Sequence, residues 1–451
     1  MKKLKYIIPV FILLIFTTSC EDSLDIEPIQ EVSPEVALGS GENVENILIG
    51  TYAEAGEAQS YGGRLQMLTD LYGFDGEASW IGTFQQPRQV FNKQIFVDNS
   101  YVRDIWLNGY EIINQANLVI DNISLVDEDN QDNILGQAYF LRAMAYFDLV
   151  RLFGANYQPG QENTQLGVPL TLEGIVDYSG DLTIPRSTVE EVYNQVLLDL
   201  GQAVQLMPAS NNFFADSYSA QALLARVYLQ QGKYPEARDA ANEVILNSGH
   251  ELTETYAGAF NNDSDSDEDI FAFQVTTQDG ANDLIVHYAD QSNGGRGGDI
   301  ILNPEFISMF DSESDVRASY VYESEQNEEI LTGKYTNQFG NIPFIRLAEI
   351  YLIRAEGNLR ETTSIGATPL EDINTVRDRA NADLLGSVSL EDILLERELE
   401  LAFEGHLIHD LKRTGREIGD FDPDANELVF PIPQREMDAN DLLEQNPGYG
   451  S

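Results

Sequence analysis

The order of apolar and polar positions along the chain predicts a protein built mostly of amphipathic helices. In the stretch 341–360 (NIPFIRLAEIYLIRAEGNLR) apolar side chains recur at spacings of three and four residues, which places them on one face of a helix. Pro343 stands where the first turn of a helix tolerates proline. A similar pattern covers 390–413, and the segment 373–380 (INTVRDRA) joins the two. We therefore expect a helical hairpin in this part of the chain.

The same periodicity predicts further helices upstream. They cover residues 44–58, 101–123, 132–153, 188–207 and 218–248. Ser187 is the expected N-cap of the fourth, with Glu190 as its capping-box partner. The last segment contains a helix, a Gly-Lys-Tyr-Pro turn and a second helix, and it resembles a tetratricopeptide unit. Repeated hairpins of this kind indicate a tetratricopeptide-like scaffold.

Two stretches lack this helical pattern. Residues 61–96 are rich in glycine and aromatic residues, and 261–336 contain an acidic run, an alternating strand-like run at 270–275 and a Gly-rich loop. An insertion of this size between helical hairpins is more often functional than not. We expect one mostly α-helical domain with minor β structure. The domain covers 42–451. Its helical scaffold is expected over about 42–60, 100–250 and 342–415, and its ligand-facing loops over about 61–98 and 255–336. An irregular C-terminal tail covers 416–451.

The N-terminus has the features of a processing signal. Lys2, Lys3 and Lys5 precede a short apolar run, and small residues then lead to Cys20, the only cysteine of the chain. The run is too short to span a bilayer, so 1–19 is interpreted as a signal peptide. Its end resembles a bacterial lipobox, which implies that Cys20 is acylated, that 20–41 is a tether and that the protein lies on a membrane surface. The alternative is an ordinary signal peptide with an incidental cysteine.

The charge of the chain restricts its partners. There are 26 Lys and Arg against 75 Asp and Glu, a formal net charge of −49. Nucleic acid needs a basic footprint and is excluded as a partner. The run Asp263, Asp265, Asp267 and Asp269 has the alternation of a calcium loop but lacks its turn glycine and terminal glutamate. We interpret it as a solvated loop, and no metal or cofactor is expected.

Several motifs, in order along the chain, resemble the SusD/RagB family of outer-membrane nutrient-binding lipoproteins. They are CEDSLD at 20–25, LRAMAYFDLVRLFG at 141–154, IPFIRLAEIYLIRAEG at 342–357, INTVRDRA at 373–380, ERELELAFEGHLIHDLKR at 396–413, FPIP at 430–433 and QNPGY at 445–449. The resemblance implies a non-catalytic protein of the outer membrane, facing the cell exterior. It also implies a SusC-type TonB-dependent transporter as partner, which imports the captured glycan. His406 and His409 fall in a scaffold motif of the family and are interpreted as helix-packing groups.

In that family the ligand contacts loops after the first helix and in the later insertion, which here are 61–84 and 288–298. Flat aromatic rings stack on the C–H faces of sugars, and amide, carboxylate and guanidinium groups bond to their hydroxyls. Trp80 is the first candidate, because no apolar stripe surrounds it; the alternative is a tryptophan packed on the scaffold. Trp106, at helical spacing, is expected in the core. The other candidates are Tyr61, Arg64, Tyr72, Asp75, Tyr288, Asn293 and Arg296, with Asp70 and His287 as neighbours.

Three hypotheses for the function remain open at this point. The first is a glycan-binding lipoprotein, and the second is a surface glycoside hydrolase, which needs two opposed carboxylates at a set separation. The third is a tetratricopeptide adaptor for a protein partner. Because a strongly negative protein repels polyanions at long range, a neutral polysaccharide is the expected ligand, such as a laminarin-type β-glucan, an α-glucan or a fructan.

Overall fold

Helices make up about half of the structure, a computed structural model that describes residues 38–277 and 280–450. Cys20, the signal peptide and all but the end of the proposed tether lie outside these residues. The helices are α3 (Gly41–Ala55), α4 (Arg64–Gly73), α5 (Gln85–Phe91), α6 (Ser100–Asp121), α7 (Glu128–Phe153), α8 (Val189–Leu206), α9 (Ser217–Gln230), α10 (Tyr234–Asn247), α11 (Asp283–Tyr288), α12 (Pro304–Ser308), α13 (Leu347–Glu361), α14 (Pro369–Arg379), α15 (Leu390–Glu400), α16 (Leu407–Thr414) and α17 (Gln434–Ala439). Short 3₁₀ turns lie at Ile123–Leu125, Tyr256–Ala259, Gln291–Asn293, Val316–Ser319 and Asn426–Leu428.

Helix ends follow local side-chain chemistry. The predicted capping box of α8 is present but lies one residue later. The Thr188 side chain accepts from the Glu191 backbone N–H, and the Glu191 side chain accepts from the Thr188 backbone N–H. Thr368 and Ser389 form the same motif at the starts of α14 and α15. These caps satisfy backbone N–H groups that have no partner inside the helix.

Two helix predictions were wrong in their limits. Residues Ile342–Arg346 form strand β6, so Pro343 lies in a strand and α13 begins at Leu347. The segment 390–413 is two helices, because Phe403 and Gly405 adopt left-handed φ angles of 66° and 82° and turn the chain between them. The linker 373–380 lies mostly within α14.

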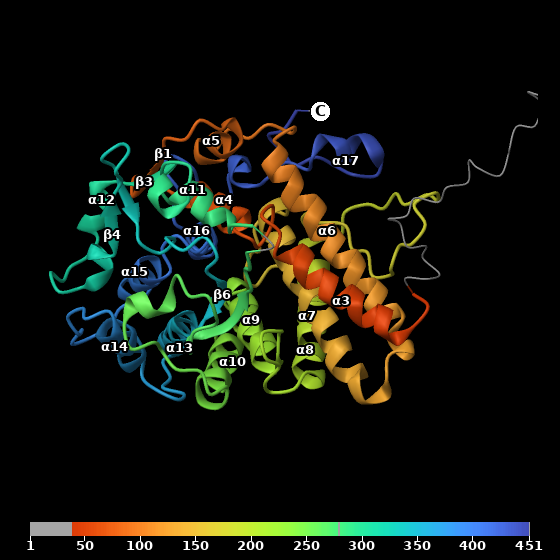
Figure 1. Ribbon diagram of the computed structural model, residues 1–451, viewed down its shortest axis with the longest axis horizontal. Coiled ribbons are helices and arrows are strands. Elements are labelled where there is room, and N and C mark those ends of the chain that lie inside the picture. The colour runs from red at the N-terminus through yellow and green to blue at the C-terminus, as the bar shows by residue number, and fades with distance from the viewer. Residues whose placement is uncertain (1–37, 278–279, 451) are drawn as a thin grey trace, which may run out of the picture.

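The helices pack in sequence as an array. Helix α3 packs on α6, α6 on α7, α7 on α8, α8 on α9, α9 on α10, and α10 on α13, which also contacts α14 and α15. Figure 1 shows this succession from α3 and α6 on the right to α13 and α14 on the left. Gly357 permits the approach of α13 to α10, because a Cβ at this position would lie 2.7 Å from the Cβ of Arg238. The predicted tetratricopeptide-like scaffold is thus confirmed, and Trp106 is buried in its core against Tyr110 and Phe153.

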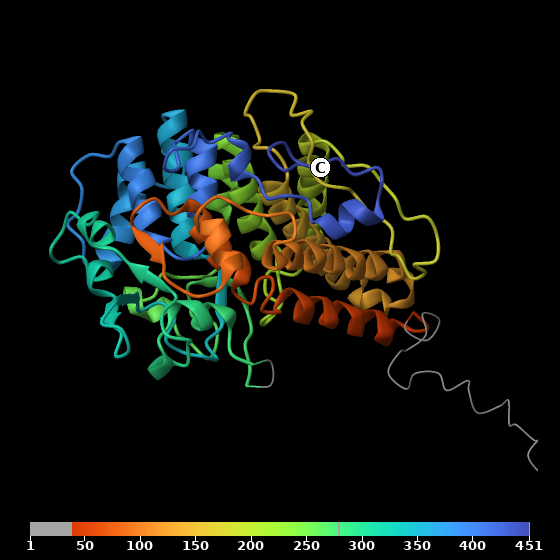
Figure 2. The ribbon, with the colours of Figure 1, turned by 90° about the horizontal axis from the view of Figure 1, so that it is seen from above.

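The strands form three small antiparallel pairs. They are β1 (Ala78–Trp80) with β3 (Ile300–Leu302), β2 (Asp269–Phe273) with β6 (Ile342–Arg346), and β4 (Val321–Glu323) with β5 (Ile330–Thr332). The segment 274–341, hereafter the excursion, leaves the scaffold at β2 and returns at β6. Figure 2 shows it in green and teal on one side of the array. The pair β1–β3 joins the excursion to the loop after α4.

Buried ion pairs hold the excursion, and strand β6 that follows it, to α15 and to the turn after α15. Arg346 contacts Glu268, Glu400 and Glu404, and all four side chains are largely removed from solvent. Arg317, within the excursion, pairs with Asp315, Glu396 and Glu400. Charges buried in this way must be paired, because an isolated ion in the interior is very costly. The junction is therefore fixed by polar contacts as well as by apolar packing.

Candidate functional site

Trp80 lies beneath the surface, not on it. It ends strand β1, is only 7 % exposed, and packs its indole against the His287 ring with centroids 5.5 Å apart. Gly82 lies close over the indole, since a Cβ there would lie 2.6 Å from Trp80 Cζ2. The expectation that Trp80 offers an open face to a sugar was wrong, because pairing of β1 with β3 turns its ring inward.

The three tyrosines predicted to face a ligand are also core residues. Tyr61 donates to Asp148 and stacks on Phe273, and Tyr72 donates to the Glu427 carbonyl. Tyr288 donates to Asp70 Oδ2 at 2.8 Å, and the carboxyl is as deeply buried as the phenol. Burial raises the pKa of Asp70 to about 8, an effect larger than the lowering by its hydrogen bonds. These phenols have polar partners inside the protein and cannot stack on a glycan.

An accessible aromatic ring does lie immediately next to Trp80. Phe84 follows it by four residues, is 39 % exposed and stands edge-on to both His287 and Tyr101, with centroids 6.1 and 6.4 Å away. Tyr101, in the first turn of α6, is half-buried. Helix α6 thus places one ring, and the loop between β1 and α5 places the other.

Two arginines named from the sequence flank these rings. The Arg296 guanidinium lies 3.8 Å from the centroid of Phe84, and that of Arg64 lies 4.0 Å from the centroid of Tyr101. Stacking of a guanidinium on an aromatic face is favourable and holds the side chain in place. Phe84, Tyr101, Arg64 and Arg296, resting on Trp80 and His287, are hereafter called the shelf. The structure therefore brings together three of the predicted residues around two that the sequence did not single out.

Carboxylates neutralise the positive charge of the shelf. Arg64 pairs with Asp104 at 3.5 Å and with Asp283 at 3.4 Å. Asp299 Oδ2 lies 2.9 Å from His287 Nδ1 and 3.8 Å from Arg296 Nε. Both acceptors and donors thus lie close to the rings. Such a surface suits hydroxyl groups, which both donate and accept.

Two buried donors of the shelf have no partner among the described residues. They are the indole Nε1 of Trp80 and Nη1 of Arg296. A buried N–H without an acceptor costs about 1–3 kcal/mol, so these positions are natural places for ordered water or a ligand oxygen after a small movement of Arg296.

The remaining predicted residues lie apart from the rings. Asn293 ends a 3₁₀ turn of the Gly-rich loop and donates to Asp290, which caps that turn. Asp75 is exposed and lies at the other end of β1, on the rim of a separate hollow. His406 and His409 pack inside the scaffold, and burial lowers the pKa of His406 to about 4. Their assignment as packing groups agrees with this environment.

Sequence reasoning missed Phe84 and Tyr101 for different reasons. Phe84 lies within the stretch 61–84 that was expected to contact ligand, but Trp80 was expected to be its stacking ring because no apolar stripe surrounds Trp80 in the sequence. Tyr101 was assigned to a scaffold helix, which is correct, yet its position at the first turn brings its ring to the surface. The available signal for Phe84 was its place between Gly82-Thr83 and the polar Gln85-Gln86.

The helical-hairpin array and the shelf, which combines aromatic rings with guanidinium groups, are the features of a binding protein built on a tetratricopeptide-like scaffold. Comparison with known proteins agrees with this class. Residues 22–229 match the family described as starch-binding associating with the outer membrane, and 324–426 match the SusD family. None of the helices within 38–277 and 280–450 is long and apolar enough to cross a membrane.

Similar proteins cover nearly the whole chain. SusD-like protein P2 of Formosa agariphila is 28 % identical over 99 % of this chain and 100 % of its own. The starch-binding protein SusD of Bacteroides thetaiotaomicron is 28 % identical over 41 % of this chain and 36 % of its own. The crystal structure of a SusD superfamily protein from the same species superposes with a TM-score of 0.82, at 26 % identity, over 90 % of this chain and all of its own. The chain belongs to the SusD/RagB family, whose members bind carbohydrate and associate with the outer membrane.

Proposed function

We propose that this protein captures a neutral poly- or oligosaccharide at the cell surface through the shelf and delivers it to a SusC-type TonB-dependent transporter. The observation that carries the proposal is Phe84, an accessible ring with Arg296 stacked on it and Asp299 nearby. Sugar C–H groups would pack on the accessible part of Phe84. Ring hydroxyls would accept from Arg296 and donate to Asp299.

A neutral glycan is favoured over an anionic one by the charge around the shelf. Arg64 already has two carboxylate partners, and Arg296 has one. A uronate or sulfate group would therefore meet three carboxylates against two guanidinium groups, in a protein whose formal net charge is −49. Laminarin-type β-glucan, α-glucan and fructan remain the candidate ligands.

The decisive experiment is native affinity electrophoresis on a panel of polysaccharides. Gels would contain laminarin, starch or levan as neutral glycans and alginate or pectin as anionic ones. We expect retardation on one neutral glycan and free migration on both anionic ones. Retardation only by alginate or pectin would contradict a neutral ligand, and migration unaffected by any glycan would favour the protein adaptor. Release of reducing ends from the retained glycan would show the hydrolase instead.

Surface attachment is proposed to depend on a lipid at Cys20. Acyl chains supply hydrophobic attachment without a membrane-spanning helix. Replacing Cys20 by serine is expected to move the protein from the membrane fraction to the soluble fraction in its native host, with glycan retardation unchanged. A Cys20→Ser protein that stays in the membrane fraction would contradict lipid anchoring, while leaving carbohydrate binding intact.

A further inference from the structure

A second concave site lies at the opposite end of strands β1 and β3 from the shelf. Asp75 and Glu77 precede β1, while Glu305 lies in α12, which follows β3, and Met309 is the C-cap of that helix. With Glu398, Leu407, Leu411, Arg416 and Glu417 they line an open hollow of about 370 Å³. This set of residues is hereafter called the acidic hollow.

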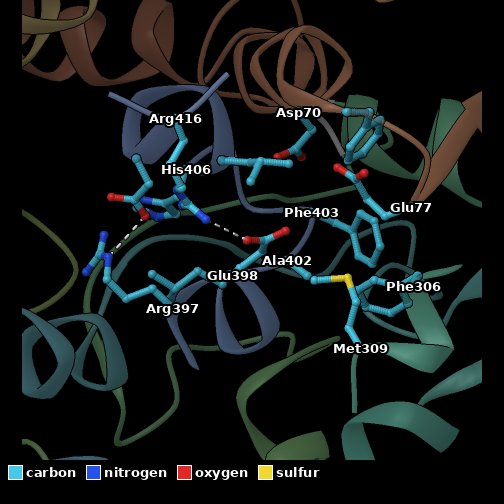
Figure 3. A pocket seen from close by; sticks show the side chains of 14 residues that line it. Asp70, Glu77, Phe306, Met309, Arg397, Glu398, Ala402, Phe403, His406 and Arg416 are labelled. Atoms are coloured by element: carbon cyan, nitrogen blue, oxygen red, sulfur yellow. Dashed lines mark hydrogen bonds and ion pairs between the residues drawn. The ribbon is translucent and has the colours of Figure 1, made fainter. Parts of the chain in front are cut away.

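The acidic hollow continues inward into a small pocket of about 20 Å³. The two share Glu77, Met309, Glu398, Leu407 and Arg416 among their lining residues. Figure 3 shows the inner pocket, with Glu77 approaching from one side and Glu398 and Arg416 from the other, above the rings of Phe306 and Phe403. The inner pocket has room for a water molecule or one small substituent. The outer hollow must hold the body of any ligand.

Unused hydrogen-bonding groups surround this space. Arg397, which is 2 % exposed and lines the inner pocket, leaves Nη1 without a partner within 38–277 and 280–450. Arg416 pairs with Glu398 at 3.2 Å, and its Nη2 has no partner in that part of the chain either. The carboxylates of Glu305 and Glu417 make no hydrogen bond or ion pair with any other described residue, so their oxygens are free to accept. The hollow therefore offers both donors and acceptors.

This mixture restricts the chemical class of the ligand. A small anion would be repelled by five carboxylates, and a cation would leave both guanidinium donors unpaired. No group of three or more acidic, histidine or cysteine side chains placed to hold a metal ion occurs within 38–277 and 280–450. Hydroxyl groups satisfy both kinds of partner at once, and Met309 and Leu407 supply an apolar wall for C–H groups.

We propose that the acidic hollow is a second carbohydrate-binding site that holds one neutral sugar unit of the glycan engaged by the shelf. The inference rests on the proposed function. Because Ala78 pairs with Leu302 and Trp80 with Ile300, the two sites lie at opposite ends of a three-residue strand pair. A rise of about 3.3 Å per residue separates them by about 10 Å along the strands. One oligosaccharide of several units is long enough to contact both.

Binding at both sites would raise the affinity for long chains. Once the shelf holds one part of a chain, the second contact is intramolecular and occurs at a high effective concentration. The hollow would therefore distinguish long chains from short ones. The shelf alone would bind both.

The test uses the full protein and two ligands, a trisaccharide and an octasaccharide cut from the neutral glycan that retards wild type. Glu305→Arg places a long cation at the exposed rim and is expected to fold normally. Met309→Trp fills the hollow and serves as a second variant if its melting temperature is unchanged. Calorimetry should show octasaccharide affinity at least about tenfold lower in both variants, because the second anchor is lost. Trisaccharide affinity should be unchanged.

The shelf variant Phe84→Ala/Arg296→Ala separates the two proposals. It should keep weak octasaccharide binding that Glu305→Arg then removes. Octasaccharide affinity equal to wild type in Glu305→Arg and Met309→Trp would overturn the second site while leaving the shelf intact. Spermidine binding to the shelf variant more tightly than the octasaccharide would overturn it in favour of an organic cation. If wild type binds neither oligosaccharide, the proposed function itself fails.

Discussion

Replacing Phe84 by alanine is expected to weaken binding of the retained neutral glycan about tenfold, which corresponds to about 1.4 kcal/mol. The ring is the accessible aromatic surface of the shelf, and Arg296 depends on it for its position. Stability should change little, because the side chain is 39 % exposed. Isothermal calorimetry with the octasaccharide gives the affinity, and a thermal melt gives the stability.

Phe213→Ala is the matched control for this prediction. Phe213 is also an exposed phenylalanine, but it lies before α9 and packs on Phe214, in a part of the scaffold remote in sequence from the shelf. Its removal should leave affinity unchanged. Equal affinities for wild type and Phe84→Ala would show that sugar does not pack on this ring. The shelf would then have to be abandoned as the capture site.

The largest expected effect on stability comes from Arg346. Replacing Arg346 by methionine removes the common partner of Glu268, Glu400 and Glu404 and leaves their charges in the interior. Removing one member of a buried ion pair typically costs about 3–5 kcal/mol. Urea unfolding at pH 7 measures this change. The control is Arg103→Met, which breaks a partly exposed pair with Asp104 and should cost at most about 1 kcal/mol.

The same variant should change the response to acid. Burial alone would raise the pKa of Glu404, but Arg346 and Lys334 outweigh it and hold the pKa at about 2. The unfolded chain takes up this proton near pH 4.5, so the stabilisation is present above pH 4.5 and is lost as pH falls towards 2. Without Arg346 the pKa rises, and stability should depend less on pH within this window. An identical pH dependence in wild type and Arg346→Met would contradict this account of the junction.

The helical scaffold could be predicted because its signals are local. Periodic apolar positions, caps such as Thr188 and the proline in the first turn of α10 can all be recognised within a few residues of sequence. The errors arose where distant segments decide the structure. Strand β6 has the apolar content of a helix but pairs with β2, about 70 residues earlier.

The candidate site was predicted less well, because exposure is a tertiary property. Trp80, at the end of β1, and Phe84, before α5, lie four residues apart, yet one is buried and the other accessible. Nothing in the local sequence states that β1 will pair with β3 and turn the indole inward. Arg64 and Arg296, expected from the sequence to contact ligand hydroxyls, lie over the rings of Tyr101 and Phe84, and their contact with a ligand stays a prediction.

Strands β2 and β6 bring the two ends of the excursion to the same place. Asp269 pairs with Arg346, and the Asn341 N–H donates to the Asn262 carbonyl, so the chain returns to where it departed. A loop with adjacent ends can lengthen, shorten or be exchanged at small entropic cost, while the helices keep their contacts. Because His287, Arg296 and Met309 all lie in this segment, transplanting a relative's version into the scaffold would offer a practical route to retargeting the protein towards another sugar.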